Sequence, residues 1–187
     1  MRRHRGKRTA TPHKGRRVAD TATNPKVVRA AKEFSFRLRE AGIRHALVGG
    51  LAVAAHGYPR ATADVDFLIS SEHAADLAGD ALGGEVSGKT VRFKGVDIDL
   101  IFPNESFLER EIPRTPPNRR GVPTISIEVL VCMKLMAARA RDQGDVVELI
   151  KRGRAPAAKV VAYLKEHRPD LVDDFAALQM QAEVEAD

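Results

Sequence analysis

The stretch "GGLAVAAHGYPRATADVDFLIS", residues 49–70, decides how this chain folds. It opens with two glycines, continues as a short apolar helical pattern, and ends in an apolar run that contains Asp64 and Asp66. Side chains two positions apart on a strand point to the same face of a sheet. We therefore expect the two carboxylates side by side on a strand over about residues 65–69, where core residues occupy the opposite face.

A second acidic pair, Asp97 and Asp99, lies in the apolar run VDIDLIF, residues 96–102. Either pair alone is equally compatible with acids on the solvent-facing side of an edge strand. Two such pairs on neighbouring strands would repel each other unless a cation compensated for them. Mg²⁺ prefers carboxylate oxygens, with water and phosphate completing its octahedron. The two pairs together therefore favour a divalent-metal site.

The remaining periodicity predicts a mixed sheet flanked by helices, followed by an all-helical C-terminal part, which is an α+β fold. We expect a core domain over residues 25–125 and a helical region over 126–187. Strands are expected at 45–48, 65–69, 90–93 and 96–102, and short edge strands within the loop-rich residues 103–123. Helices are expected at 27–41, 51–56, 72–82, 126–140 (with Ser126 as N-cap), 142–152, 156–167 and 170–184.

The positive charge is concentrated at the N-terminus. Residues 1–24 hold eight Lys/Arg and one acid, whereas the rest of the chain holds 23 basic and 24 acidic residues. Because this tail has almost no large apolar side chains, we expect it to be disordered. It is either a solvated leader or an arm that contacts nucleic-acid phosphates.

Composition also excludes several classes of protein. The single Cys132 rules out a disulfide framework and reads as a core residue in a reducing, cytoplasmic protein. No apolar run is long enough to span a bilayer, so no membrane association is expected.

Two further features of the sequence bear on the site. Gly49 and Gly50 separate a strand from a helix, where a backbone without Cβ atoms is either a plain turn or an approach to an anion. Lys134 is the only charge between Glu128 and Arg139 in a helical segment, and it either extends to water or holds a phosphate. If that helix is unbroken, Arg141 and Asp145 share its face.

Together these motifs resemble the signature of the DNA-polymerase-β-like nucleotidyltransferase superfamily. The stretch "ALVGGLAVAAHGYPRATADVDFLIS", residues 46–70, matches its G-[GS] after a strand, short helix and D-x-D on the next strand. The run 96–102 matches its later strand, which carries a third carboxylate. Residues 127–150 resemble the downstream helices of small bacterial nucleotidyltransferases of the abortive-infection toxin type, which contain a Lys and an R-[DK]-x-x-D-like element. The resemblance covers roughly residues 27–152.

The resemblance implies a set of site residues. Asp64, Asp66 and Asp99 would hold two Mg²⁺ ions, or Mn²⁺, around a nucleoside triphosphate. We choose Asp99 over Asp97 because it abuts the apolar end of its strand. The implied nucleotide-binding residues are Gly49, Gly50 and Lys134, with Arg60 and Asp142 as auxiliaries and Lys134 also counted as catalytic.

The implied reaction is attack of an acceptor hydroxyl on the α-phosphate, with release of pyrophosphate. The first acceptor we consider is RNA, for instance a tRNA 3′ end, which would make the protein toxin-like and imply a cognate antitoxin. The alternatives are a protein hydroxyl, a small molecule such as an aminoglycoside, or a catalytically inactive binding module of the same fold. The complete set of carboxylates favours an enzyme, and the basic tail favours RNA.

Overall fold

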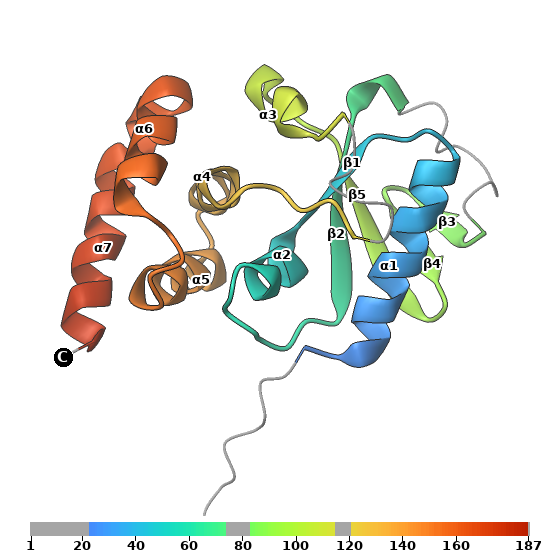
Figure 1. Ribbon diagram of the computed structural model, residues 1–187, viewed down its shortest axis with the longest axis horizontal. Helices are drawn as coiled ribbons and strands as arrows, with labels where there is room; N and C mark the ends of the chain where they lie inside the picture. The colour runs from blue at the N-terminus through green and yellow to red at the C-terminus, as the bar shows by residue number, and fades with distance from the viewer. Residues whose placement is uncertain (1–22, 74–82, 115–120, 187) are drawn as a thin grey trace, which may run out of the picture.

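The computed structural model describes residues 23–73, 83–114 and 121–186 (Figure 1). Its centre is a mixed sheet of five strands in the order β1-β2-β5-β4-β3. Strands β2 and β5 are parallel, and the other neighbouring pairs are antiparallel. The strands are β1 (His45–Val48), β2 (Asp64–Ile69), β3 (Glu85–Ser87), β4 (Thr90–Phe93) and β5 (Val96–Ile101). The α+β prediction is confirmed, and β3 is a strand that the sequence pattern did not reveal.

One face of the sheet is covered by α1 (Pro25–Glu40), whose apolar stripe supplies the core. The ring of Phe34 lies 6.1 Å from that of Phe67 on β2 and 5.3 Å from that of Phe93 on β4, and all three rings are buried. The side chain of Asn24 caps this helix by accepting a hydrogen bond from the backbone N–H of Lys26 at 2.9 Å. Burial of these alternate strand residues turns the intervening residues of β2 and β5, the acids, to the other face.

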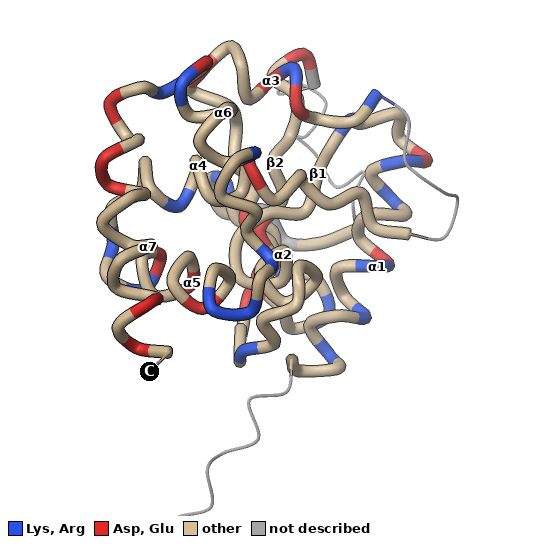
Figure 2. The backbone as a smooth tube through the Cα atoms, turned by 60° about the vertical axis from the view of Figure 1, so that its left-hand side comes forward, with Lys and Arg blue, Asp and Glu red and all other residues tan. Residues whose placement is uncertain are grey.

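The other side of the molecule is helical. Figure 1 shows α2 (Gly49–Ala55) beside β2, with α4 (Ile127–Ala137), α5 (Ala140–Lys151), α6 (Ala157–His167) and α7 (Val172–Ala186) beyond it. Ser126 caps α4 as predicted, because its hydroxyl accepts from the Val129 N–H. Basic residues lie along α1 and acidic residues lie along α7, and the two helices are at opposite sides of the molecule (Figure 2). Among the described residues, no helix is long and apolar enough to cross a membrane.

Three sequence-based expectations need correction or lie beyond the description. The edge strands expected within residues 103–123 are wrong for the described part, which contains the helix α3 (Ser106–Glu111). This helix forms because Phe107 is buried against α6, where its ring stacks on that of His167 at 5.0 Å. The predicted helix over 72–82 lies almost entirely outside the described residues, as does nearly all of the basic tail.

Two separate helices were expected over 126–140 and 142–152, and two are present; the unbroken helix on which a shared face of Lys134, Arg141 and Asp145 depended does not form. Ala138 adopts a left-handed conformation with φ of 54° and ends α4, and α5 begins two residues later.

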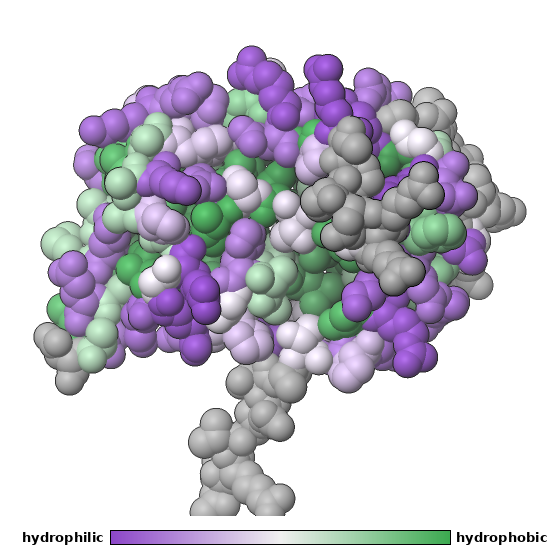
Figure 3. Space-filling view, viewed as in Figure 1, coloured by the Kyte–Doolittle hydropathy of each residue, from purple (hydrophilic) through white to green (hydrophobic). Residues whose placement is uncertain are grey.

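Figure 3 shows apolar residues at the surface between α1 and α2, where a pocket of about 280 Å³ is lined mainly by small and aliphatic side chains.

The buried His45 makes folding sensitive to acid. Its Nδ1 donates to the Ile43 carbonyl at 2.9 Å, so its Nε2 accepts from the Ser35 hydroxyl at 2.7 Å. Burial lowers the pKa of His45 from 6.5 to about 4. In the unfolded chain the His45 imidazole is protonated below about pH 6.5, whereas in the folded chain it is protonated only below about pH 4.

We expect the free energy of unfolding to fall by about 3 kcal/mol from this group as the pH drops from 7 to 4. Urea unfolding of the wild-type and His45→Gln proteins across this range measures the effect, since Gln does not titrate. Parallel stability curves for the two proteins would contradict the assignment.

Candidate functional site

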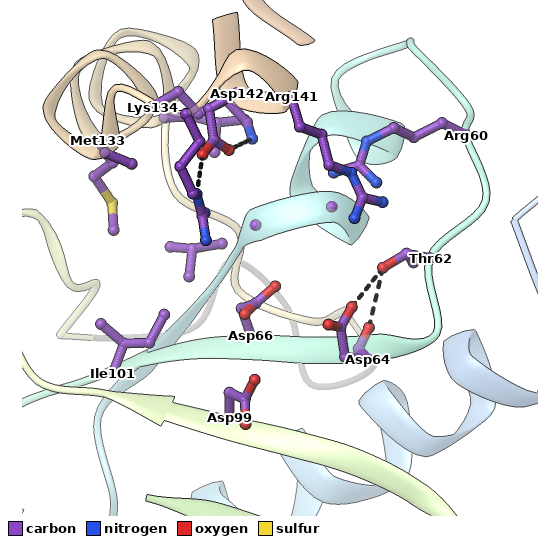
Figure 4. Close-up of a pocket in the computed structure, with 16 residues that line it drawn as sticks. Arg60, Thr62, Asp64, Asp66, Asp99, Ile101, Met133, Lys134, Arg141 and Asp142 are labelled. Carbon is purple, nitrogen blue, oxygen red and sulfur yellow. Dashed lines mark hydrogen bonds and ion pairs between the residues drawn. The ribbon is translucent and has the colours of Figure 1, made fainter. Parts of the chain in front are cut away.

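A pocket of about 370 Å³ opens where the ends of β1, β2 and β5 face α4 and α5 (Figure 4). The β2–β5 register sets Asp64 opposite Asp97 and Asp66 opposite Asp99. The pocket collects all eight site residues predicted from the sequence. Its lining residues include Gly49, Gly50, Arg60, Asp64, Asp66, Asp99, Lys134 and Asp142.

Each of the three pocket carboxylates on β2 and β5 accepts a hydrogen bond from a neighbouring donor. The Thr62 hydroxyl donates to Asp64 at 2.7 Å, and the Thr90 hydroxyl donates to Asp99 at 2.6 Å. Asp66 accepts from the backbone N–H of Gly50. These contacts leave other lone pairs of the acids directed at the pocket.

The three acids repel one another. The pKa of Asp66 is raised from 3.8 to about 6, first by burial and then by the negative charges of Asp64 and Asp99. A raised carboxyl pKa means that the charged form lacks sufficient compensation, which a bound cation would supply. Hard carboxylate oxygens are the donors that Mg²⁺ prefers. The donor chemistry thus fits a divalent cation, although within the described ranges no three acidic, His or Cys groups already enclose a metal-sized position.

Tertiary structure separates the two acids of the second pair. Asp97 is half-exposed and forms an ion pair at 2.5 Å with Arg92 on the neighbouring strand, outside the pocket. Asp99 lines the pocket beside Asp66. The geometry is therefore in keeping with the choice of Asp99, and its role stays a prediction.

Gly49 allows α2 to begin directly over the acids. Its φ is 60°, in the left-handed region, and a Cβ built there would lie 1.8 Å from Asp66 Oδ2. At Gly50 a Cβ would lie 2.9 Å from the Thr62 hydroxyl oxygen. Both positions exclude larger side chains, and Gly49 brings the backbone against the Asp66 carboxylate.

Lys134 is the centre of a buried ion-pair network, which corrects the idea that it extends to water. Only 5% of its surface is exposed, and its Nζ lies 2.8 Å from both Asp142 Oδ1 and Asp145 Oδ2. Asp145 also lies 2.7 Å from Arg60 Nε, and Asp142 lies 2.5 Å from Arg139 Nε. The network joins α4, α5 and the loop before β2. It forms across the break at residue 138 between α4 and α5, whereas a shared face of these residues was expected only if the helix were unbroken.

Removing the Lys134 charge is therefore expected to reduce stability as well as any nucleotide binding. The substitution Lys134→Met leaves two buried carboxylates with one cationic partner each, a loss on the order of 3 kcal/mol. Urea unfolding measures it. Lys151→Met is the matched control, because Lys151 also meets two carboxylates, at 3.1 and 3.2 Å, but at the surface. Equal, small effects of both substitutions would contradict the buried network.

Several lining residues were not predicted from the sequence as site residues. Thr62, Arg139 and Arg141 contribute polar groups, whereas Ile101 and Met133 contribute an apolar wall. Asp145, which the sequence placed only by helix periodicity, holds Arg60 and Lys134. The R-D-x-x-D run of residues 141–145 was an available signal for Asp145, but its ion pairs with Arg60 and Lys134 were not predicted from the sequence.

The fold places this chain among proteins of nucleotidyltransferase-like fold. The antibiotic-resistance factor ANT(2'')-Ia, solved in solution and described as having substrate-regulated conformation dynamics, aligns over 83% of this chain and 96% of its own. The TM-score is 0.52 and the sequence identity 15%. An antigenic nucleotidyltransferase-like protein from Paracoccidioides brasiliensis aligns over 83% of this chain and 94% of its own, with a TM-score of 0.51 and 17% identity.

At these identities the likeness concerns the fold alone. Comparisons with protein-family models and with curated proteins gave no match.

Proposed function

We propose that this protein is a metal-dependent nucleotidyltransferase that moves a nucleoside monophosphate from a nucleoside triphosphate to an acceptor hydroxyl. The observation that carries the proposal is the convergence of Asp64, Asp66 and Asp99 on one pocket from adjacent parallel strands. Two glycines and four cationic side chains share that pocket. The fold likeness supports the proposal, since it is a likeness to nucleotidyltransferase-like proteins.

Asp64, Asp66 and Asp99 would hold two Mg²⁺ ions, with Mn²⁺ as a substitute. The ions would neutralise the triphosphate and the oxygens that enter and leave phosphorus. Asp99, which the Thr90 hydroxyl orients, would receive the proton of the acceptor hydroxyl. A bond then forms between the acceptor oxygen and the α-phosphorus, and the bond from that phosphorus to pyrophosphate breaks.

The remaining site residues would hold the nucleotide. Gly49 and Gly50 allow phosphate oxygens to approach the backbone at the start of α2. Arg60 would meet the phosphates from a fixed position, since Asp145 holds its guanidinium. Lys134 and Asp142 would position this cationic wall from within the buried network. In that network three cations, Lys134, Arg60 and Arg139, face the two carboxylates of Asp142 and Asp145, which leaves one net positive charge.

RNA is the acceptor we favour, and a tRNA 3′ end with a toxin-like role and a cognate antitoxin is its most specific form. This rests on the family resemblance and on positive charge, which extends from the basic tail into α1 with five Lys/Arg and two Glu. A small-molecule acceptor is the second candidate. It is favoured by the likeness to an antibiotic-resistance factor of the same fold.

The test is incubation of the protein with Mg²⁺ and each α-³²P-labelled nucleoside triphosphate, together with total RNA, protein extract or an aminoglycoside. Labelled RNA supports the favoured acceptor, and labelled protein or aminoglycoside supports the alternatives. The label should vanish with EDTA. Absence of label and of nucleotide binding under all conditions would reject the enzyme and favour a binding module.

A further inference from the structure

The pocket has two chemically different ends, with the acids between them (Figure 4). Arg60, Arg141 and Thr62 lie at one end. Ile101 and Met133 lie at the other, and Asp66 and Asp99 occupy the middle. A ligand that spans the acids must therefore place different chemistry at each end.

The cationic end is built to hold negative charge. The Arg60 guanidinium is fixed by Asp145, at 2.7 Å from Nε and 3.0 Å from a terminal nitrogen. That same guanidinium lies beside Gly50, where a Cβ would approach it to 3.1 Å. Arg141 is exposed and donates to the Ala61 carbonyl at 3.4 Å, which leaves further N–H groups for a ligand. This end suits the pyrophosphate part of the nucleotide.

The two side chains of the apolar end, Ile101 and Met133, are only partly buried. Ile101 follows Asp99 by two positions on β5, so it shares the face of the acids, and 36% of it is exposed. Met133 lies on α4 directly before Lys134 and is partly buried. Val48, Leu130 and Ala137 also line the pocket, and the first two are buried. Ile101 and Met133 thus present partly exposed apolar surface in an otherwise polar pocket, which suits contact with an apolar part of a ligand.

We propose that Ile101 and Met133 form the acceptor subsite and bind the base of an acceptor nucleoside. The inference rests on the proposed function. In an in-line displacement the attacking oxygen approaches phosphorus opposite the leaving group. Pyrophosphate at the cationic end therefore requires the acceptor hydroxyl to arrive from the apolar end, where Asp99 can receive its proton.

The charge balance of the pocket selects against a polycationic acceptor. Apart from the three site acids, the described lining residues contain one carboxylate, Asp142, and it is paired with Lys134 and Arg139. An ammonium-rich sugar would find no uncompensated acid there. A nucleobase has an uncharged flat face for Ile101 and Met133.

The test uses uncharged near-isosteres that remove the apolar contact. We expect Ile101→Thr and Met133→Gln each to lower transfer to RNA by about tenfold or more in kcat/KM. The dissociation constant of a Mg²⁺-bound α,β-methylene triphosphate analogue should stay within about twofold, which also shows that the variants are folded. Met180→Gln is the matched control, because Met180 is 62% exposed on α7, away from the pocket. It should behave as wild type.

Three outcomes would overturn the subsite. Weaker binding of the analogue by about tenfold in the variants would assign the apolar end to the base of the nucleotide itself. Unchanged transfer to RNA would show that the acceptor does not touch these side chains. Labelling of an aminoglycoside or of protein in place of RNA would reject the nucleoside. In all three the wild-type protein still transfers nucleotide, whereas a wild-type protein that binds no triphosphate fails the proposed function and the subsite together.

Discussion

The substitutions Asp64→Asn, Asp66→Asn and Asp99→Asn are each expected to lower nucleotidyl transfer by about a hundredfold or more. Each removes a charged ligand from the proposed metal site, and bound cations contribute several kcal/mol of transition-state stabilisation in such reactions. The fold should survive. Asn is nearly the same size, and removing a charge from a cluster in which burial and repulsion raise the pKa of Asp66 relieves strain between like charges. Single-turnover transfer and thermal unfolding measure the two effects.

Asp97→Asn is the matched control for this series. Asp97 lies on the same strand as Asp99 and faces the same way, but it pairs with Arg92 outside the pocket. Its substitution should cost less than about tenfold, or roughly 1.4 kcal/mol of barrier. If Asp97 proved more important than Asp99, the assignment of the third carboxylate would be wrong. Transfer above about a tenth of wild type in both Asp64→Asn and Asp66→Asn would reject the metal site.

Gly49→Ala is expected to damage both the site and the fold. The new methyl group would meet Asp66 Oδ2 at 1.8 Å, so the carboxylate must turn away or α2 must shift. A left-handed φ adds on the order of 1 kcal/mol for a residue with a Cβ. We expect loss of transfer comparable to that of Asp66→Asn, together with a clearly lower melting temperature.

Gly153→Ala separates the collision from the backbone cost. Gly153 has a φ of 63°, close to the 60° of Gly49, but a Cβ there would meet nothing within 4 Å. Its substitution should show the conformational cost alone and leave transfer intact. Equal melting temperatures for the two variants, with full transfer in Gly49→Ala, would show that the backbone of Gly49 does not need to approach the acids.

The local pattern was sufficient for much of the core. Alternation around Asp64 and Asp66 predicted their strand and common face, because a strand's side-chain period depends only on backbone geometry. The cap at Ser126 was equally readable, since capping involves a hydroxyl and an N–H three residues apart. The α1 stripe around Phe34 was visible for the same reason. These features require no knowledge of what lies across the molecule.

Long-range contacts decided the rest. The α3 helix exists where proline-rich sequence indicated loops, because Phe107 finds an aromatic partner some 60 positions away, at His167. Burial there outweighs weak local propensity. The short strand β3 likewise depends on pairing with β4, which no single-strand pattern predicts.

By itself the sequence determined the ingredients of the site: two glycines, paired acids on strand-like segments and a lone lysine in an apolar helix. Only the tertiary structure decided their partners. It separated Asp99 from Asp97, because an Arg on the adjacent strand neutralises one and the pocket receives the other. It also buried Lys134 between two carboxylates, because the left-handed residue at 138 ends α4 and α5 then packs against it. Side-chain periodicity is a property of the local backbone, whereas charge pairing depends on which surfaces meet.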